Sequence, residues 1–464
     1  MDKFFKIKQS GSNVRTEIAA GITTFFTMAY IIFVNPDILA VSGMSWDGVY
    51  IATIIATAVG TLVMALVAKV PYAVAPGMGL NAFFTYTVCF GLGFAWQEAL
   101  AMVFICGIIN IIITVSKLRK IIVQAIPKSL QLAIGGGIGL FIAYIGLKNA
   151  DFLMFIDTTE GVTSGMAIVP SLANFDNLGA IVAIVGLVIT VILMLSKVKG
   201  AILIGILGAT IVAILTGFVH VPPVSELFVS KTGAVKDVAF SFFGSPGLGS
   251  MFSDPSRILP VILVIFAFSL TDTFDTIGTF VGTGRKTGIF DAEDEKALSS
   301  GSGFKSKMDK ALFADSIATS IGALAGTSNA TTYIESAAGI GVGGKTGLAS
   351  VVTAVLFLLC LPFGSLFGIV PSQATAPALI IVGVLMAESF IGIKWDEMEE
   401  ALPAFLTVIV MAFAYNISYG IAAGFLFYSI VKISKREGKE VHPILYVCTG
   451  LFILNFVVLA LGII

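Results

Sequence analysis

The sequence predicts an all-α polytopic membrane protein, and three observations lead to this fold class. Hydrophobic residues occupy 57% of the 464 positions and charged residues only 12%, whereas charged residues make up about 25% of a soluble domain. Apolar runs of about 17–25 residues, long enough to cross a bilayer, recur along the chain. Two shorter runs are interrupted by glycine, proline and hydroxyl residues at comparable positions of the two halves.

The first half contains seven segments, of which the third is interrupted. Its long runs lie near 17–34, 48–69, 98–116, 128–148, 178–196 and 201–219, and its interrupted run is PYAVAPGMGLNAFFTYTVCF at 71–90. The second half repeats this outline with long runs near 257–284, 311–326, 347–368, 372–391, 402–415 and 417–434 and the interrupted run AGTSNATTYIESAAGIG at 325–341. Because seven is odd, the second half is inverted relative to the first. Paired interrupted segments in two such halves are typical of a transporter binding site.

Basic residues predict the orientation. They cluster before the first run and in connections that fall on one side of the bilayer under this count, which the positive-inside rule assigns to the cytoplasm: Lys3, Lys6, Lys8, Arg15, Lys117, Arg119, Lys120, Lys197, Lys199, Arg285, Lys286, Lys305, Lys307, Lys310, Lys432, Lys435 and Arg436. The connection at 149–177, with Asp151, Asp157, Glu160 and Asp176, then lies outside. A final apolar run at 443–464 is long enough to span, and the sequence leaves open whether it crosses and where the C-terminus lies.

Each interrupted segment is expected to be a short strand followed by a half-helix. In the first, the half-helix begins after Gly77; in the second, Thr327, Ser328 and Asn329 are good N-cap residues for a helix that carries Glu335. A half-helix that begins near the membrane midplane presents unpaired N–H groups and a positive dipole end to a ligand. Irregular backbone at this depth is tolerated only beside protein or a cavity, which predicts a central site lined by both segments.

Four polar residues are expected to gather at this site. Asp272 and Asp275 lie one helical turn apart in the run FAFSLTDTFDTIGTFVG, and an ionised carboxylate in hydrocarbon is costly enough to mark a functional position by default. Asn81 and Glu335 come from the two interrupted segments. Carboxylates can accept parallel N–H bonds from a planar ring, and acids held close together cannot all stay ionised, so the sequence predicts that protons bind here. The alternative is a structural polar network that joins helices.

Other sites are disfavoured. The four cysteines (Cys89, Cys106, Cys360 and Cys448) occur singly in apolar runs, which is unlike a disulfide or metal framework. GIGVGGKT at 339–346 matches the phosphate-loop pattern, but it lacks the preceding buried strand, so Lys345 is interpreted as an interface anchor. Phe25, Phe26, Phe83 and Phe84 are candidates for stacking on a ligand, with packing the expected role. We therefore predict no enzyme, metal, cofactor, signal peptide or nucleic-acid partner.

At these residues the chain resembles the AzgA-like purine permeases of the nucleobase:cation symporter family, which are related to the xanthine and uracil permeases. The resemblance is carried by RTEIAAGITTFFTMAYIIFVNP (15–36), APGMGLNAFF (75–84), TDTFDTIGT (271–279) and GTSNATTYIESAAGI (326–340). It implies a fourteen-helix 7+7 inverted repeat in which a core domain moves like an elevator against a gate domain. It also implies proton-coupled uptake of hypoxanthine, guanine or adenine, with Asn81, Asp272 and Glu335 contacting the purine and Asp275 essential for transport.

The resemblance also predicts the domain boundaries. These are a cytoplasmic N-terminus (1–16), core (17–125), gate (126–220), extracellular connection (221–256), second core repeat (257–369), second gate repeat (370–434) and C-terminal segment (435–464). The expected location is the cell membrane, with the lipid bilayer, a purine and H⁺ as partners. An anion or other small-solute carrier on the same fold is the alternative. The preferred purine, Na⁺ in place of H⁺ and the oligomeric state, including a homodimer, stay open.

Overall fold

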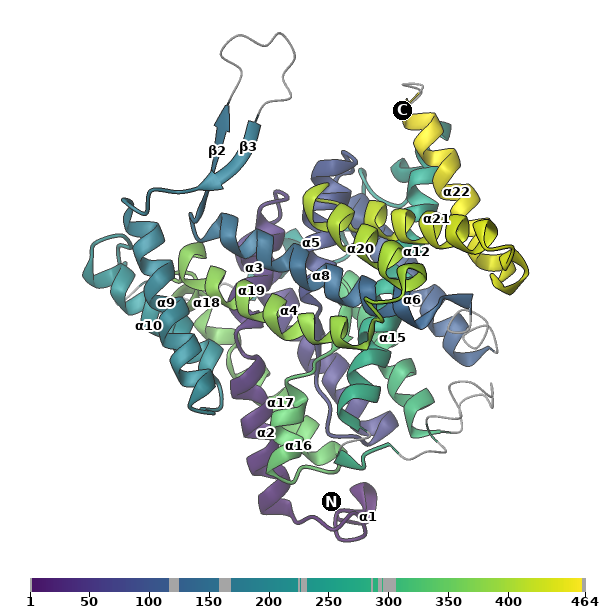
Figure 1. Ribbon diagram of the computed structural model, residues 1–464. Helices are drawn as coiled ribbons and strands as arrows, with labels where there is room; N and C mark the ends of the chain where they lie inside the picture. The colour runs from purple at the N-terminus through teal and green to yellow at the C-terminus, as the bar shows by residue number, and fades with distance from the viewer. Residues whose placement is uncertain are drawn as a thin grey trace.

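The computed structural model describes residues 2–116, 125–157, 168–223, 226, 232–284, 287–290, 294 and 306–460. Helices dominate this part of the chain (Figure 1), and nine of them are long and apolar enough to cross a membrane. The predicted fold class is therefore confirmed. Several charged residues used to predict the orientation (Lys117, Arg119, Lys120, Glu160, Arg285, Lys286 and Lys305) lie outside the described residues, so the orientation stays a prediction.

The first half begins with a short helix and continues with long spans. Its α-helices are α1 (Asp2–Phe5), α2 (Val14–Met28), α3 (Ile31–Ala40), α4 (Trp46–Val63), α5 (Met78–Ala82), α6 (Trp96–Val115), α8 (Lys128–Asn149), α9 (Leu178–Leu195) and α10 (Ala201–Leu215). The π-helical turns η1 (Met64–Ala68) and η2 (Phe83–Gly91) extend α4 and α5. Side-chain caps fix several of these starts: the Ser45 hydroxyl accepts the Gly48 N–H, and the Asn177 amide oxygen accepts the Ala180 N–H.

The second half has the same general order. Its α-helices are α12 (Pro255–Thr279), α15 (Lys307–Ala325), α16 (Ser336–Val342), α17 (Gly347–Leu359), α18 (Gly364–Phe367), α19 (Ser372–Met386), α20 (Met398–Phe413), α21 (Ile417–Ser434) and α22 (Pro443–Ala460). Short turns complete it: η3 (Thr232–Asp237), η4 (Ser241–Phe243), η5 (Ser250–Phe252), η6 (Phe280–Gly284), η7 (Leu361–Phe363), η8 (Ala387–Gly392) and η9 (Gly438–Glu440). The last apolar run thus forms a helix, α22, which packs against α21 and α12 (Figure 1).

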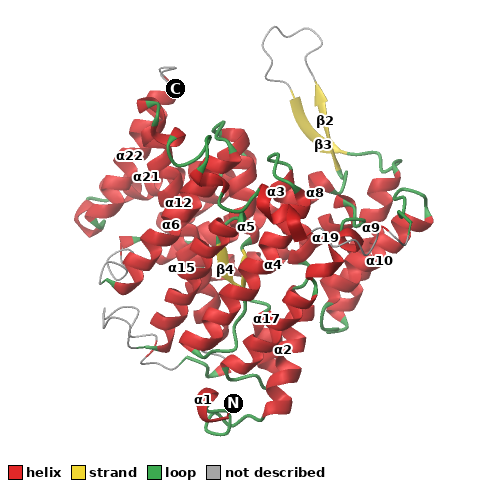
Figure 2. Ribbon diagram, turned by 180° about the vertical axis from the view of Figure 1, so that it is seen from behind, coloured by secondary structure: helices red, strands yellow, loops and turns green. Residues whose placement is uncertain are grey.

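Two short antiparallel sheets interrupt the helices. Strand β1 (Val74–Pro76) pairs with β4 (Ala330–Thr332), so that Ala75 lies opposite Thr331. Figure 2 shows β4 in the middle of the helices. Strands β2 (Leu153–Asp157) and β3 (Ile168–Leu172) form a second pair that projects from the helices in Figure 1. The sequence analysis predicted the strand in each interrupted segment but did not predict this hairpin.

Helix packing divides the described elements into two groups. In the first, which we call the α2–α15 group, α15 packs against α4 and α6, and α16 and α17 pack against α2. In the second, the α8–α21 group, α8 packs against α19 and α20, α20 against α21, and α9 against α10. The first group also includes α3, which packs against α4 and α5, and α12, which packs against α6. Contacts between the groups are fewer; they join α12 to α8 and α21, α3 to α19, α5 to α8 and α2 to α10.

Candidate functional site

Pairing of β1 with β4 brings the two interrupted segments together at the centre of the molecule. Further bonds tie them: the Gly77 N–H donates to Asn329 O at 2.9 Å, and the Ala73 N–H donates to the Ser336 hydroxyl at 3.0 Å. The Tyr333 hydroxyl donates to Pro76 O at 2.6 Å. Since these strand groups are buried, each bond satisfies a backbone group that has no access to water. The residues that follow each strand are therefore held in fixed positions.

Asn81 lies in α5, directly after the first strand, and is fully buried. Its amide Nδ2 donates to Asn35 Oδ1 at 3.0 Å, and Asn35 Nδ2 donates to the hydroxyls of Thr53 and Thr327 at 2.7 and 2.8 Å. Asn81 Oδ1 has no hydrogen-bond partner among the described residues. A buried acceptor in this condition is an exception that calls for a water or a ligand.

Asp272, on α12, is 1% exposed. Its Oδ2 accepts from Asn110 Nδ2 at 2.9 Å and from the Thr319 hydroxyl at 3.2 Å. Within the described part of the chain its Oδ1 makes no hydrogen bond, although the Asn329 side chain lies next to the carboxylate. Asp272 therefore combines one satisfied oxygen with one that is available to a ligand.

Glu335 borders a groove. It immediately precedes α16 and is half-buried, and its Oε1 accepts from the Tyr30 hydroxyl at 2.6 Å. The groove has a volume of about 380 Å³. One wall is formed by Thr27, Ile334, Glu335, Ala337 and Ala338, and the other by residues 197–202, Leu385 and Glu388. Of the four predicted site residues, only Glu335 lines this groove.

Asp275 lies one turn after Asp272 and is half-buried. Its side chain interacts with Thr331 of β4, and its charge acts on both Asp272 and Glu335. The structure therefore places Asp275 beside the second interrupted segment, where its charge acts on one acid of its own helix and on one acid of that segment.

The sequence analysis missed one acid of this cluster, Asp315 in α15. It is 3% exposed, its Oδ1 accepts from the Thr332 hydroxyl of β4 at 2.8 Å, and Asp272 and Asp275 both act on it electrostatically. The rule applied to Asp272, that an acid inside an apolar span marks function, would have identified it.

The expected N-cap of the second half-helix is wrong. Thr327, Ser328 and Asn329 precede β4 instead of the helix, and α16 begins after Glu335, which makes no side-chain cap bond. Three residues of extended strand and the turn after it separate the hydroxyl run from α16. Thr327 instead accepts from Asn35, because paired strand geometry overrides the local capping preference of these residues.

The phosphate-loop pattern at 339–346 has another role. The backbone N–H groups of Lys345 and Thr346 donate to the two carboxylate oxygens of Glu17, at 2.9 and 3.2 Å. Glu17 is fully buried, so the donors that would hold a phosphate already bind an internal carboxylate. The candidate stacking aromatics pack against other rings: Phe25 contacts Phe357, and Phe83 contacts Phe268.

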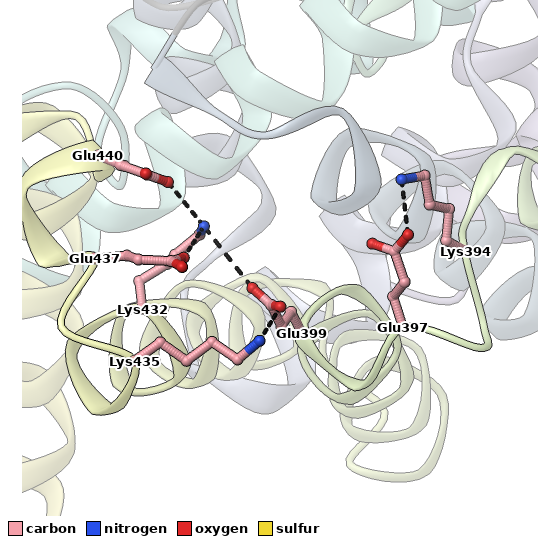
Figure 3. Close-up of polar contacts among 7 residues, drawn as sticks. All are labelled: Lys394, Glu397, Glu399, Lys432, Lys435, Glu437 and Glu440. Atoms are coloured by element: carbon pink, nitrogen blue, oxygen red, sulfur yellow. Dashed lines mark hydrogen bonds and ion pairs between the residues drawn. The ribbon is translucent and has the colours of Figure 1, made fainter.

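The ion pairs of the described residues involve none of the four predicted site residues. Figure 3 shows the largest cluster, in which Lys432 contacts Glu437 at 2.6 Å, Glu440 at 2.9 Å and Glu399 at 3.9 Å, and Lys435 also pairs with Glu399. These pairs join the ends of α20 and α21 to η9. We call the place where β1 pairs with β4, together with Asn81, Asp272, Asp275 and Glu335, the crossing. The acids at the crossing accept hydrogen bonds from neutral donors, among them Asn110, Thr319 and Tyr30.

Comparison with known proteins identifies the family. Residues 15–423 match the Permease family. The chain belongs to this family. The permease is 40% identical over 463 residues to the guanine/hypoxanthine permease PbuO of Bacillus subtilis, covering 98% of this chain and 100% of that protein. It is 37% identical over 457 residues to the adenine permease AdeP of Escherichia coli, covering 98% and 96%. The resemblance to the purine permeases is thereby confirmed, and so is the prediction that the chain is not an enzyme.

A solved structure supports the fold of the permease. The transmembrane domain of the cyanobacterial bicarbonate transporter BicA superposes with a TM-score of 0.61 at 16% identity, over 88% of this chain and 97% of that one. At this identity the likeness concerns the fold alone. The permease is thus a multi-pass membrane transport protein with the fold of that transporter.

Proposed function

We propose that the permease is a proton-coupled symporter of purine nucleobases in a cell membrane, with its N-terminus in the cytoplasm. The observation that carries the proposal is the joint occurrence of purine permease relatives and a buried crossing whose side chains suit a purine. Asn81 Oδ1 and Asp272 Oδ1 lack hydrogen-bond partners within the described residues. Both are acceptors, and a purine presents ring and exocyclic N–H donors.

Glu335 supports a route to this crossing. A groove of about 380 Å³ is lined in part by Glu335, and ligand pockets of small molecules have volumes from about 300 Å³ upward. Asn81 and Asp272 lie deeper and are nearly inaccessible. We infer that a purine enters along the groove, meets Glu335 first and reaches the other two residues as the groove deepens.

The acids support coupling to protons. The ion pairs of the described residues leave Asp272, Asp275 and Glu335 without a basic partner. Close carboxylates that lack a countercharge cannot all remain ionised at low cost, so the pair Asp272 and Asp275 is expected to carry a proton that moves with the purine. Asp315 adds a third acid to the same set.

The two helix groups support an elevator-type mechanism. We propose that the α2–α15 group is the core domain (17–125 and 257–369) and the α8–α21 group is the gate domain (126–220 and 370–434). Packing within each group is more extensive than packing between them, as expected of bodies that move relative to one another. The core would then carry Asn81, Asp272, Asp275 and Glu335 together across the membrane.

An anion carrier remains the second candidate, because Lys197 and Lys199 line the groove. Both are exposed and lie in the connection between α9 and α10, whereas the residues at the crossing are acidic or neutral. A carrier of anions would be expected to place a positive charge at the crossing itself.

One experiment tests the proposal against this alternative. The purified permease is reconstituted into vesicles, and uptake of labelled hypoxanthine is measured with and without an inward proton gradient. Competition by guanine, adenine, uracil, xanthine and bicarbonate then reports the substrate class. Gradient-driven uptake that a protonophore abolishes and purines inhibit supports the proposal. Uptake that depends on Na⁺ and is insensitive to the protonophore would exclude coupling to protons. Uptake of labelled bicarbonate that purines do not inhibit would favour the anion carrier.

A further inference from the structure

Asp37, near the end of α3, joins the two helix groups at a point far from Glu335. Its Oδ1 accepts from the Trp46 indole N–H at 2.8 Å, and its Oδ2 accepts from the Thr375 hydroxyl at 2.9 Å. Trp46 begins α4, in the same group as Asp37, whereas Thr375 lies in α19 of the other group. Thr375 is 3% exposed, so the second bond is shielded from water.

Asp37 and Thr375 each have another hydrogen-bond partner within their own helix group, Trp46 for Asp37 and Ser372 for Thr375. Thr375 Oγ1 is also 3.0 Å from Ser372 O, an acceptor in its own helix. A hydroxyl has one proton, so Thr375 can donate to Asp37 or to Ser372 but not fully to both. If the groups separate, Thr375 still donates to Ser372 O and Asp37 still accepts from Trp46. Breaking this contact therefore leaves neither donor without an acceptor, and only Asp37 Oδ2 loses its donor, so the cost of parting the groups is confined to one carboxylate oxygen.

The same two spans border the groove at their other ends. Thr27 at the end of α2 lines it, and Asp37 lies ten residues further along that span; Leu385 at the end of α19 lines it, and Thr375 lies ten residues earlier. Ten helical residues extend about 15 Å. The two groups are thus joined by a buried polar bond at the Asp37 end, whereas at the Glu335 end the groove lies between them beside the contact of α2 with α10.

We infer that the contact between Asp37 and Thr375 is a releasable latch that holds the permease closed at the Asp37 end while the groove is open. The inference rests on the proposed alternating access of the two helix groups. In the opposite state the groups must part at this end, and the Thr375 hydroxyl then donates to Ser372 O instead of Asp37 Oδ2. The latch selects between states and takes no part in binding the purine.

Thr375→Val tests the latch, because valine keeps the size of threonine and removes the hydroxyl. Ala338→Cys in the groove serves as the reporter, in a background with the four native cysteines replaced, and its rate of modification by a membrane-impermeant maleimide reports how often the groove is open. We expect Thr375→Val to lower this rate by at least about threefold, since a hydrogen bond to a charged group favours the latched state. Thr375→Ser should restore the original rate.

Thr210→Val is the matched control. Thr210 is also buried in the α8–α21 group, and its hydroxyl donates to Ile206 O of its own helix at 2.8 Å. It should leave the rate unchanged. An unchanged rate in folded Thr375→Val, or an equal decrease in both valine variants, would overturn the latch. Because this readout does not depend on the substrate, failure of purine uptake in the parent protein would refute the proposed function and leave the latch result valid.

A cross-link provides a second test that does not depend on folding of the valine variant. Asp37→Cys and Thr375→Cys are combined and joined by a short bifunctional methanethiosulfonate reagent. In a chain without the reporter cysteine, we expect the cross-link to stop uptake and reduction of its disulfides to restore uptake. Full cross-linking with undiminished uptake would show that the two residues need not separate, and the latch would be wrong.

Discussion

The two interrupted segments share a backbone plan but differ in what they present. In the first, α5 follows β1 after Gly77 and packs against α8, in the other helix group, and Asn81 is buried. In the second, α16 follows β4 after three further residues and packs against α2 of its own group, and Glu335 borders the groove. One repeat thus supplies a buried neutral amide and the other a half-buried acid at the edge of the groove. A symmetric scaffold can therefore hold an asymmetric site.

Asp275 lies beside the second segment and acts on two other acids, and its neutralisation should have the largest effect. Asp275→Asn keeps the size of the side chain but removes the charge that acts on Asp272 and Glu335. We expect accumulation of hypoxanthine driven by a proton gradient to be abolished, because the pair no longer needs a proton to relieve its repulsion. Some substrate binding should remain. Vesicle uptake with an imposed gradient, paired with equilibrium binding, measures both, and accumulation equal to that of the parent would contradict the prediction.

The carboxylates of Asp272 and Glu335 should contribute most to the affinity for the purine. Asp272→Asn and Glu335→Gln turn acceptor-only oxygens into groups that also donate, so each should mispair with purine N–H groups. Losing a charge-assisted bond costs about 1.5–3 kcal/mol, which corresponds to a decrease in affinity of about tenfold or more for each. Calorimetric titration with hypoxanthine measures it.

Glu400→Gln is the control, since Glu400 lies in the first turn of α20, away from the crossing. A folded double variant of Asp272 and Glu335 that binds with unchanged affinity would remove both residues from the site.

Two glycines of α16 test how closely the second half-helix is held. A Cβ at Gly339 would lie 2.1 Å from Thr24 Oγ1 and 2.6 Å from Ala20 O of α2, so Gly339→Ala must push the helix away from its support. Such overpacking costs about 1–3 kcal/mol, and we expect a lower thermal midpoint and weaker purine binding.

At Gly341 no atom lies within 4 Å of an added Cβ, so Gly341→Ala should be neutral or slightly stabilising. Scanning calorimetry of both variants compares them directly. Equal midpoints would mean that α16 is not fixed against α2.

Sequence reasoning reached the parts of this site that depend on composition. Asn81, Asp272, Asp275 and Glu335 are polar residues in apolar runs, and the first strand ends at Pro76 and Gly77, which disfavour a continuing helix. The structure brings the segments together as predicted. That a ligand binds these residues stays a prediction.

Other features depend on contacts between distant residues, which periodicity does not report. The hydrogen bond between Thr332 and Asp315 joins residues 17 positions apart in the sequence, and the one between Asp37 and Thr375 joins residues 338 positions apart. The N-cap prediction at Thr327–Asn329 was wrong for the same reason: these residues are followed by β4, which pairs with the first segment and separates them from α16. The hairpin of β2 and β3 was missed because each strand has only five residues, too few to stand out as an apolar run.

The loop after the second half-helix should give the smallest effect. Lys345→Ala is expected to leave purine uptake unchanged within about twofold, because the exposed Lys345 side chain is separate from the backbone N–H that binds Glu17. Glu17→Ala is the contrasting variant: it leaves the N–H groups of Lys345 and Thr346 without their acceptor, at a cost of about 1–3 kcal/mol for buried donors, and should lower the thermal midpoint. Uptake by both variants, and binding of a nucleoside triphosphate by the parent protein, distinguish an internal carboxylate site from a phosphate-binding loop. Loss of uptake in Lys345→Ala together with nucleotide binding would mean that the loop holds a phosphate. The charge of the lysine would then be required, whereas binding of Glu17 uses only backbone N–H groups.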